Sequence, residues 1–167
     1  MAPGGYALED HWHGNHQALL GDRHFDVLVL QQGPSTLPES QANLREWATT
    51  WAREARRFGT EPALYMAWPV RTQTGGFTLV SQSYRNAALA AEAALFPAGE
   101  AWADVLQADP SIPLHSSDDL HATPAGSFLA AMVIARGLVE LDTAKVPSRV
   151  GGITVPNLYA RYGNTAP

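Results

Sequence analysis

The apolar positions of this chain form short continuous runs that alternate with stretches of helical period. The run at 25–31 is rich in branched residues, which is typical of a strand buried on both faces in a parallel sheet, and the run at 63–68 is predicted to be the next buried strand. Turn residues follow both runs, with Gly-Pro-Ser at 33–35 after the first and Pro69 after the second. A third, short strand is predicted near 94–97.

Helical spacing is clearest over 44–58, where apolar residues recur at steps of three and four. A capping-box pattern at 36–39 precedes this helix, and Gly59 suits the position just after its end. Pro124, with Thr123 as its cap, begins a helix that is apolar nearly all round and is therefore expected to be buried. Further helical stretches are predicted at 8–20 with Gly21 as a stop signal, at about 80–95 and at 101–106.

Strands that alternate with helices over short connections predict an α/β fold. We expect a three-layer α/β/α, flavodoxin-like arrangement with a short parallel sheet. Residues 1–167 are expected to form a single domain, with about 141–167 as a tail packed on its surface. Ligands bind beyond the carboxyl ends of the strands in such sheets. Three loops are therefore candidate sites: those after Gln31, after Trp68 and before Pro124.

Composition narrows the possible partners. The 167 residues are 46% hydrophobic and 16% charged, which is ample material for a core. The net charge of −5 and the scattered basic residues argue against a nucleic-acid partner, and the apolar runs are too short for a membrane span. The lack of cysteine excludes disulfides, thiolate metal sites and a cysteine nucleophile. No targeting signal is evident, so a cytoplasmic location is the default expectation.

Two loops contain residues suited to acyl transfer. Asp118 precedes His121 by three positions, a spacing that can place a carboxylate beside the imidazole to fix its tautomer and stabilise the imidazolium. Alternatively, Asp118 and Asp119 favour the following helix N-terminus and His121 is a surface residue. In the loop after the first strand, backbone N–H groups at Gly33 and Ser35 could line an oxyanion hole, or the segment is an ordinary turn.

Three segments carry a family resemblance. Residues 118–131, DDLHATPAGSFLAA, resemble the last sequence block of the SGNH (GDSL-type) hydrolases, in which the Asp and His of Asp-x-x-His complete a catalytic triad. Residues 25–35 resemble the strand and loop that carry the family's Gly-x-Asn-Asp oxyanion block. Residues 4–12 are similar to its second block, whose Gly backbone N–H is another oxyanion donor. The resemblance extends from about 4 to 138.

This resemblance implies an SGNH-hydrolase-like fold and the hydrolysis of small acyl esters or lactones. His121 would be the general base, with Asp118 as the carboxylate that orients it. The backbones of Gly5 and Gly33 would be the oxyanion donors. The substrate would be a small-molecule ester or lactone, and no cofactor is expected.

The sequence departs from the family pattern in two places. The oxyanion Asn has no counterpart, and Gln31, Gln32 or Ser35 would replace it. The family's nucleophilic Ser lies upstream of the Gly-Gly block, where this chain has only residues 1–3, so the N-terminal strand is expected to be missing. Three explanations follow: an inactive truncated member, a different nucleophile with Ser35 as the candidate, or direct activation of water by His121.

A histidine cluster supports a rival interpretation. His11, His13 and His16 form His-x-His-x-Asn-His, one substitution from the zinc motif of metallo-β-lactamase-fold hydrolases. Zinc or another divalent metal would then generate the hydroxide nucleophile. The segment before His11 is not a buried apolar strand and the motif lacks its Asp, so a solvated set of histidines is favoured.

A non-enzymatic interpretation also follows from the expected missing strand. Its loss would expose the edge of the strand at 25–31, and unpaired apolar edges associate. The chain would then be an inactive binding or oligomerising module, with a homodimer through the exposed sheet edge as the expected assembly.

Overall fold

The computed structural model describes residues 5–73, 75–139, 149–150 and 153–154. Its larger sheet contains three parallel strands, as the sequence predicts, and the structure gives their order as β1–β2–β3. Val27 lies opposite Glu61, and Ala63 lies opposite Ala94. The strands are β1 (Val27–Leu30), β2 (Glu61–Tyr65) and β3 (Ala94–Phe96).

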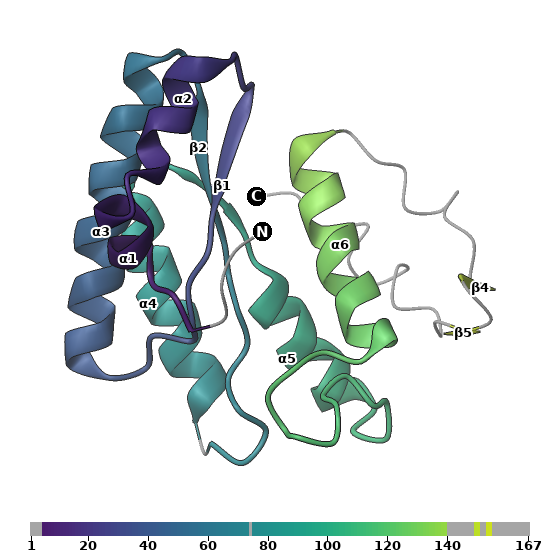
Figure 1. Cartoon of the computed structure of the whole chain (residues 1–167). Helices are drawn as coiled ribbons and strands as arrows, with labels where there is room; N and C mark the ends of the chain where they lie inside the picture. Colours follow the sequence, from purple (N-terminus) through teal and green to yellow (C-terminus); the bar gives the residue numbers. More distant parts are fainter. Residues whose placement is uncertain (1–4, 74, 140–148, 151–152, 155–167) are drawn as a thin grey trace.

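Helices cover both faces of this sheet. Figure 1 shows α3 and α4 side by side on one face, while α6 lies on the other face with α5 beside it. The predicted three-layer α/β/α architecture is therefore confirmed. The helices are α1 (Leu8–His13), the 3₁₀ helix η1 (His16–Ala18), α2 (Leu19–Asp22), α3 (Pro38–Arg57), α4 (Gly76–Ala91), α5 (Ala98–Ala108) and α6 (Pro124–Leu138).

Two helix ends form as the sequence predicts. Gly59 follows α3 with φ +73°, a left-handed conformation that favours glycine at this position. At the start of α6, the Thr123 hydroxyl accepts a hydrogen bond from the Gly126 N–H at 3.2 Å. The N-terminus of α3 differs, because Leu37 is its N-cap and its N–H donates to the Ser40 hydroxyl at 3.1 Å. Helix α3 thus begins six residues before the apolar pattern does.

Other sequence expectations were wrong. The stretch 8–20 is not one helix, because the chain breaks after α1 at Gly14 and Asn15, which has φ +61°. Gly21 lies within α2 rather than stopping a helix. Helix α4 ends at Ala91, four residues early, because Glu92 adopts a left-handed conformation.

Burial also differs from expectation in two elements. Strand β1 is not buried on both faces: Val29 is 40% exposed, because β1 lies at the edge of the three-stranded sheet. Helix α6 buries one side through residues such as Leu129 and Met132, while Leu138 is 45% exposed. The expected tail at 141–167 lies outside the described residues, apart from the short antiparallel pair β4 (Arg149–Val150) and β5 (Ile153–Thr154).

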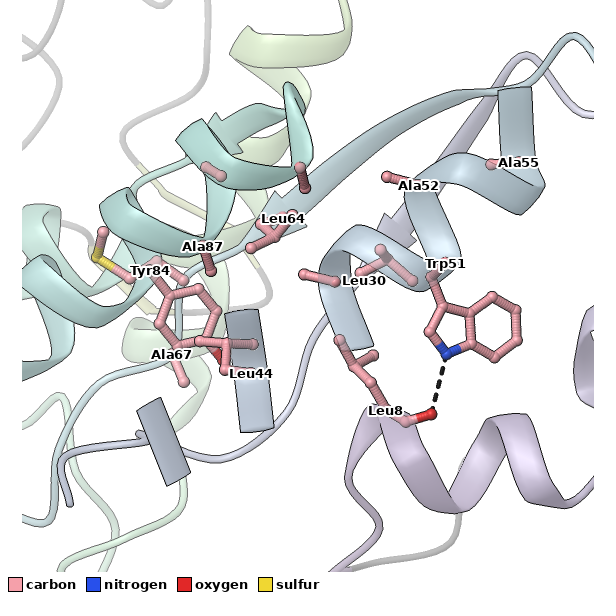
Figure 2. Packing of buried hydrophobic residues seen from close by; sticks show 14 of the residues in the cluster. Leu8, Leu30, Leu44, Trp51, Ala52, Ala55, Leu64, Ala67, Tyr84 and Ala87 are labelled. Atoms are coloured by element: carbon pink, nitrogen blue, oxygen red, sulfur yellow. Dashed lines mark hydrogen bonds between the residues drawn. The ribbon is translucent and has the colours of Figure 1, made fainter. Parts of the chain in front are cut away.

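The core has two parts. The larger part packs α1, α3 and α4 against the sheet, and Figure 2 shows the Trp51 indole N–H donating to the Leu8 carbonyl at 2.9 Å. The smaller part joins α5 to α6 and includes Trp102, Leu114 and Leu129. It lies beneath the loop that carries Asp118. No helix in the described part of the chain is both long and apolar enough to cross a membrane.

Candidate active site

Loops after β1 and β2 and before α6 are contiguous at the carboxyl ends of the strands. The Gln73 amide donates to the Thr36 hydroxyl at 2.9 Å, which joins the first loop to the second. The Arg71 backbone N–H donates to the Asp119 carbonyl at 2.9 Å, which joins the second loop to the third. The three loops proposed from the sequence as ligand sites therefore form one surface.

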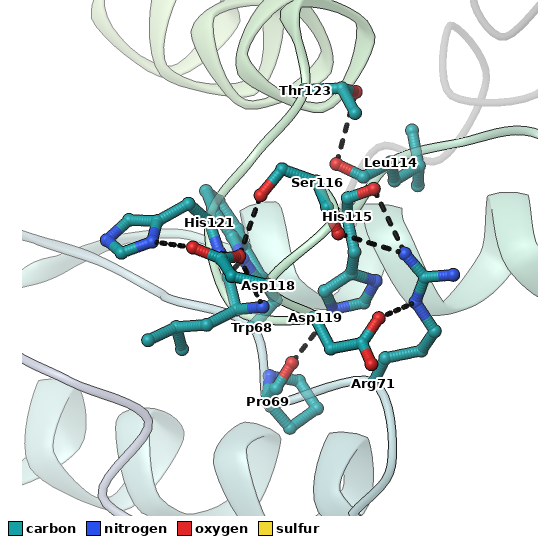
Figure 3. A network of polar contacts seen from close by, with 11 residues as sticks. Trp68, Pro69, Arg71, Leu114, His115, Ser116, Asp118, Asp119, His121 and Thr123 are labelled. Atoms are coloured by element: carbon teal, nitrogen blue, oxygen red, sulfur yellow. Dashed lines mark hydrogen bonds and ion pairs between the residues drawn. The ribbon is translucent and has the colours of Figure 1, made fainter.

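Residues 115–122 of the third loop form a short hairpin. His115 and Ala122 make an antiparallel bridge, and the Ser116 N–H donates to the His121 carbonyl at 2.7 Å. Asp119 lies at the turn with φ +60°, a conformation that is uncommon for a non-glycine residue and better tolerated by Asp than by most. The hairpin brings the Asp118 and His121 side chains together on its side away from Arg71, where they point toward one another (Figure 3).

Asp118 and His121 form a hydrogen-bonded dyad. Asp118 Oδ2 lies 2.5 Å from His121 Nδ1, while Asp118 Oδ1 accepts from the Ser116 hydroxyl at 2.7 Å and from the backbone N–H groups of Leu120 and His121 at 3.0 and 2.9 Å. These bonds, the one from His121 foremost, hold the pKa of Asp118 well below its usual range. An ionised carboxylate can only accept, so Nδ1 carries the proton and Nε2 of the neutral ring is an acceptor.

The dyad is open to solvent. The side chains of His121 and Asp118 are 76% and 50% exposed. Attraction between charges at such an exposed position contributes little to stability. The backbone and hydroxyl donors to Asp118, rather than burial, therefore fix its orientation.

An aromatic layer supports the hairpin from below. The Trp68 indole N–H donates to the Leu120 carbonyl at 3.0 Å. Trp68 stacks on the fully buried Trp102 with ring centroids 3.9 Å apart and an interplanar angle of 4°. The buried His115 lies edge-on to Trp102, and its Nε2 lies 3.0 Å from the Pro69 carbonyl. The underside of the hairpin thus packs on buried or stacked aromatic side chains and is not exposed to solvent.

The candidates in the loop after β1 are engaged in contacts of their own. The buried Gln32 side chain accepts from the Leu8 N–H at 3.1 Å and donates to the Ser35 hydroxyl at 3.0 Å. Ser35 is 7% exposed, and its hydroxyl lies 3.2 Å from the Gly33 carbonyl, to which it donates. Among the described residues, no hydrogen bond joins Ser35 to His121. The hydrogen bonds of the Ser35 hydroxyl are thus made to Gln32 and Gly33, within its own loop.

The other predicted donors lie at the surface. Gly33 is exposed, and its carbonyl accepts from the Tyr84 hydroxyl at 3.1 Å. Gly5 is exposed with φ +83°, and a Cβ there would meet nothing within 4 Å. The side chain of Gln31 donates to the Gln32 carbonyl at 2.9 Å.

The histidine cluster is divided. His11 Nδ1 lies 2.9 Å from His16 Nδ1, whereas the His13 ring lies edge-on against Trp47 with centroids 5.2 Å apart. His13 Nε2 is 3.8 Å from a Glu9 carboxylate oxygen. Within the described ranges, no three His, Cys, Asp or Glu side chains are grouped in a way that could hold a metal ion.

Comparison with known proteins bears on the fold. No protein-family model and no curated protein matches the sequence. Among solved structures, the chain is similar to a putative SGNH hydrolase from Slackia heliotrinireducens, with 23% identity, a TM-score of 0.71 and 81% of each chain covered. The fold is similar to that of an SGNH hydrolase. The fold class inferred from the sequence is thereby confirmed.

Within this SGNH-like fold, sequence reasoning identified the dyad segment but missed the residues around it. Arg71 and Trp68 contact the hairpin from the loop after β2, and His115 and Ser116 lie at its base. The sequence offered one signal for Arg71, which is its position: a charged residue two places after Pro69 lies at the carboxyl end of a predicted strand, where ligands bind. Spacing along the chain cannot reveal a contact between residues more than 40 positions apart.

Proposed function

We propose that the chain hydrolyses small acyl esters or lactones, with His121 as general base and Asp118 as the carboxylate that orients it. The observation that carries the proposal is the 2.5 Å contact between Asp118 Oδ2 and His121 Nδ1 at the carboxyl-end surface of the sheet. This contact leaves Nε2 of an exposed ring available to accept a proton. The similarity of the fold to a putative SGNH hydrolase supports the same reaction class.

The proposed nucleophile is water. His121 Nε2 removes a proton from water as the oxygen attacks the acyl carbon, and the carbonyl electrons move to its oxygen. Asp118 stabilises the imidazolium, and the backbone N–H groups of Gly5 and Gly33 are the proposed oxyanion donors. The attack forms a tetrahedral intermediate. Its collapse breaks the acyl C–O bond, and His121 returns the proton to the leaving alcohol oxygen. The buried, internally bonded hydroxyl of Ser35 favours water over Ser35 as nucleophile.

Hydrolysis of p-nitrophenyl acetate and γ-butyrolactone tests the dyad. His121→Ala is expected to lower kcat/KM by about 10²–10⁴-fold, the usual contribution of a general base. His24→Ala is the matched control, because His24 Nε2 lies 3.4 Å from Asp26 Oδ1 in another exposed His–Asp pair, near the amino end of β1. Equal losses in both variants, or an inactive wild type, would contradict the proposal.

Fluorophosphonate labelling followed by peptide mapping tests the nucleophile separately. We expect no labelled serine, and we expect Ser35→Ala to retain wild-type activity. Labelling at Ser35 together with loss of activity in Ser35→Ala would replace water with a serine nucleophile while leaving the dyad in place.

A second candidate function, self-association through β1, has its own structural support. The Asp26 carbonyl accepts from the Glu61 N–H at 3.0 Å, so the backbone groups of the alternate residues Val27 and Val29 face away from β2. Among the described residues, no strand pairs with that edge. A largely apolar groove of about 370 Å³ follows it and is bordered by Phe25 and Leu19, the latter 53% exposed. We propose that two copies pair edge to edge here about a two-fold axis.

Light scattering after size-exclusion chromatography tests this association. The wild type is expected to be a dimer and Val29→Lys a monomer, because a charge on the edge strand blocks pairing. Leu89→Lys is the control, since Leu89 is 80% exposed on α4 and away from β1. A wild type that stays monomeric across the concentration range would contradict the proposal.

A further inference from the structure

Arg71 contacts three residues of the dyad hairpin, which are His115, Ser116 and Asp119. Its Nε lies 2.9 Å from Asp119 Oδ1, and its Nη2 donates to the carbonyls of His115 and Ser116 at 3.1 and 3.2 Å. Its backbone N–H also donates to the Asp119 carbonyl at 2.9 Å. Figure 3 shows the guanidinium on the side of the hairpin opposite His121. One residue of the β2 loop thus holds both the start of the hairpin and its turn.

The parts that Arg71 holds are the ones that need support. Asp119 has φ +60°, so the turn departs from the conformations that an aspartate prefers. The carbonyls of His115 and Ser116 lie at the start of the hairpin, where the Ser116 hydroxyl also donates to Asp118 Oδ1 at 2.7 Å. A change in the position of Ser116 or Asp119 would therefore move the Asp118 carboxylate relative to His121.

The geometry points to Arg71 as a positioning residue for the dyad, an inference that rests on the proposed hydrolase function. Arg71 lies in the loop after the central strand β2 and holds the hairpin against that loop. Asp118 thereby stays in contact with His121 Nδ1. Arginine suits this role because its planar fork can bond a carboxylate and two carbonyls together, whereas a lysine ammonium acts as a point charge. The half-exposed guanidinium directs both Nε and Nη2 at the hairpin.

Arg71→Met and Arg71→Lys test this role with a neutral ester such as p-nitrophenyl acetate. Arg71→Met is expected to lower kcat by about 10–100-fold with little change in KM, since small misplacements of catalytic groups can cost that much. Arg71→Lys, which keeps the charge opposite Asp119, is expected to recover part of the loss. Arg85→Met is the matched control, because Arg85 makes an exposed two-pronged pair with Glu100 at 2.6 and 2.7 Å.

A second readout does not depend on activity. Nitrogen-15 NMR of the His121 ring reports its tautomer, and Nδ1–H is expected in the wild type because of Asp118. Arg71→Met is expected to raise the Nε2–H fraction, while Arg85→Met leaves it unchanged. Thermal unfolding of each variant shows whether the substitution destabilises the whole fold. The kcat and the His121 tautomer are then compared at a temperature below the Tm of every variant.

The outcomes separate the inference from the function on which it rests. An inactive wild type whose His121 tautomer still depends on Arg71 would refute the hydrolase proposal and support the positioning role. An active wild type whose kcat and tautomer are unchanged in Arg71→Met would overturn the positioning role alone. A raised KM with unchanged kcat and tautomer would also overturn it, because Arg71 would then bind substrate instead.

Discussion

Replacement of Gly126 by alanine is expected to destabilise the fold at the smaller core. Gly126 is the third residue of α6, where it is buried against α5 and the start of the dyad loop. A Cβ at this position would lie 2.4 Å from Trp102 Cζ2 and 2.5 Å from the Leu114 carbonyl oxygen. Trp102 is 0% exposed and stacked on Trp68, and a backbone carbonyl cannot rotate away, so neither neighbour can yield easily.

Two opposing terms set the size of this effect. Overpacking a well-filled core costs about 1–3 kcal/mol. Alanine regains up to about 1 kcal/mol over glycine within a helix, and less near the helix end. The clash wins, so the free energy of unfolding should fall by about 1–2 kcal/mol. For a domain of this size, each kcal/mol lowers Tm by about 2–4 °C, which gives a decrease of about 2–8 °C.

Thermal unfolding followed by circular dichroism measures this change. Gly33→Ala is the matched control, because a Cβ there would meet nothing within 4 Å and the residue lacks a positive φ. Its Tm should stay unchanged or rise slightly, since alanine restricts the unfolded chain. A Tm for Gly126→Ala equal to or above that of the wild type would refute the packing described for α6, Trp102 and the dyad loop.

Three further predictions address other contacts. Tyr84→Phe should lower the free energy of unfolding in urea by about 1–3 kcal/mol, because the buried hydroxyl donates to the Gln32 carbonyl at 2.6 Å and accepts from the Gln32 N–H at 3.3 Å, and both bonds are lost. Asp118→Asn should lower Tm at neutral pH, and the difference in Tm from the wild type should shrink as the pH falls below about 4. The pKa of Asp118 is lower in the folded than in the unfolded chain, so its ionised carboxylate stabilises the fold above the unfolded pKa. This stabilisation is lost as the pH falls toward the folded pKa. A constant difference across that range would contradict this assignment. Trp51→Phe should speed hydrogen exchange in α1, because the indole N–H that bonds the Leu8 carbonyl at 2.9 Å is lost, and unchanged exchange would show that this bond does not anchor α1.

Local sequence signals predicted the elements whose causes are local. The apolar period of α3, the Gly59 conformation after it and the Thr123 cap of α6 each depend on residues within one or two turns of the chain. The stretch at 8–20 failed because Gly14 and Asn15 break a pattern of apolar residues that would otherwise support one helix. Apolar spacing alone does not register such a break.

Burial and site assembly depend on neighbours that are distant in sequence. An apolar run does not distinguish a central strand from an edge strand, so the 40% exposure of Val29 could not be read from residues 25–31. The Asp118–His121 contact was predictable because it spans three residues within one turn. The contact between Arg71 and Asp119 was not, because it requires knowing which loops meet at the end of the sheet.

The exposure of the dyad determines which substitutions affect chemistry rather than folding. Because His121 and Asp118 are largely solvated, their mutual attraction cannot by itself hold one geometry. The geometry comes instead from donors fixed by the hairpin, which rests on Trp68 below and on Arg71 at its side. Substitutions at Arg71 should therefore change catalysis more than stability, whereas substitutions in the layer beneath, such as Gly126→Ala, should change stability first. Parallel measurements of kcat and Tm across the two sets test whether the hairpin is a positioning element separate from the core.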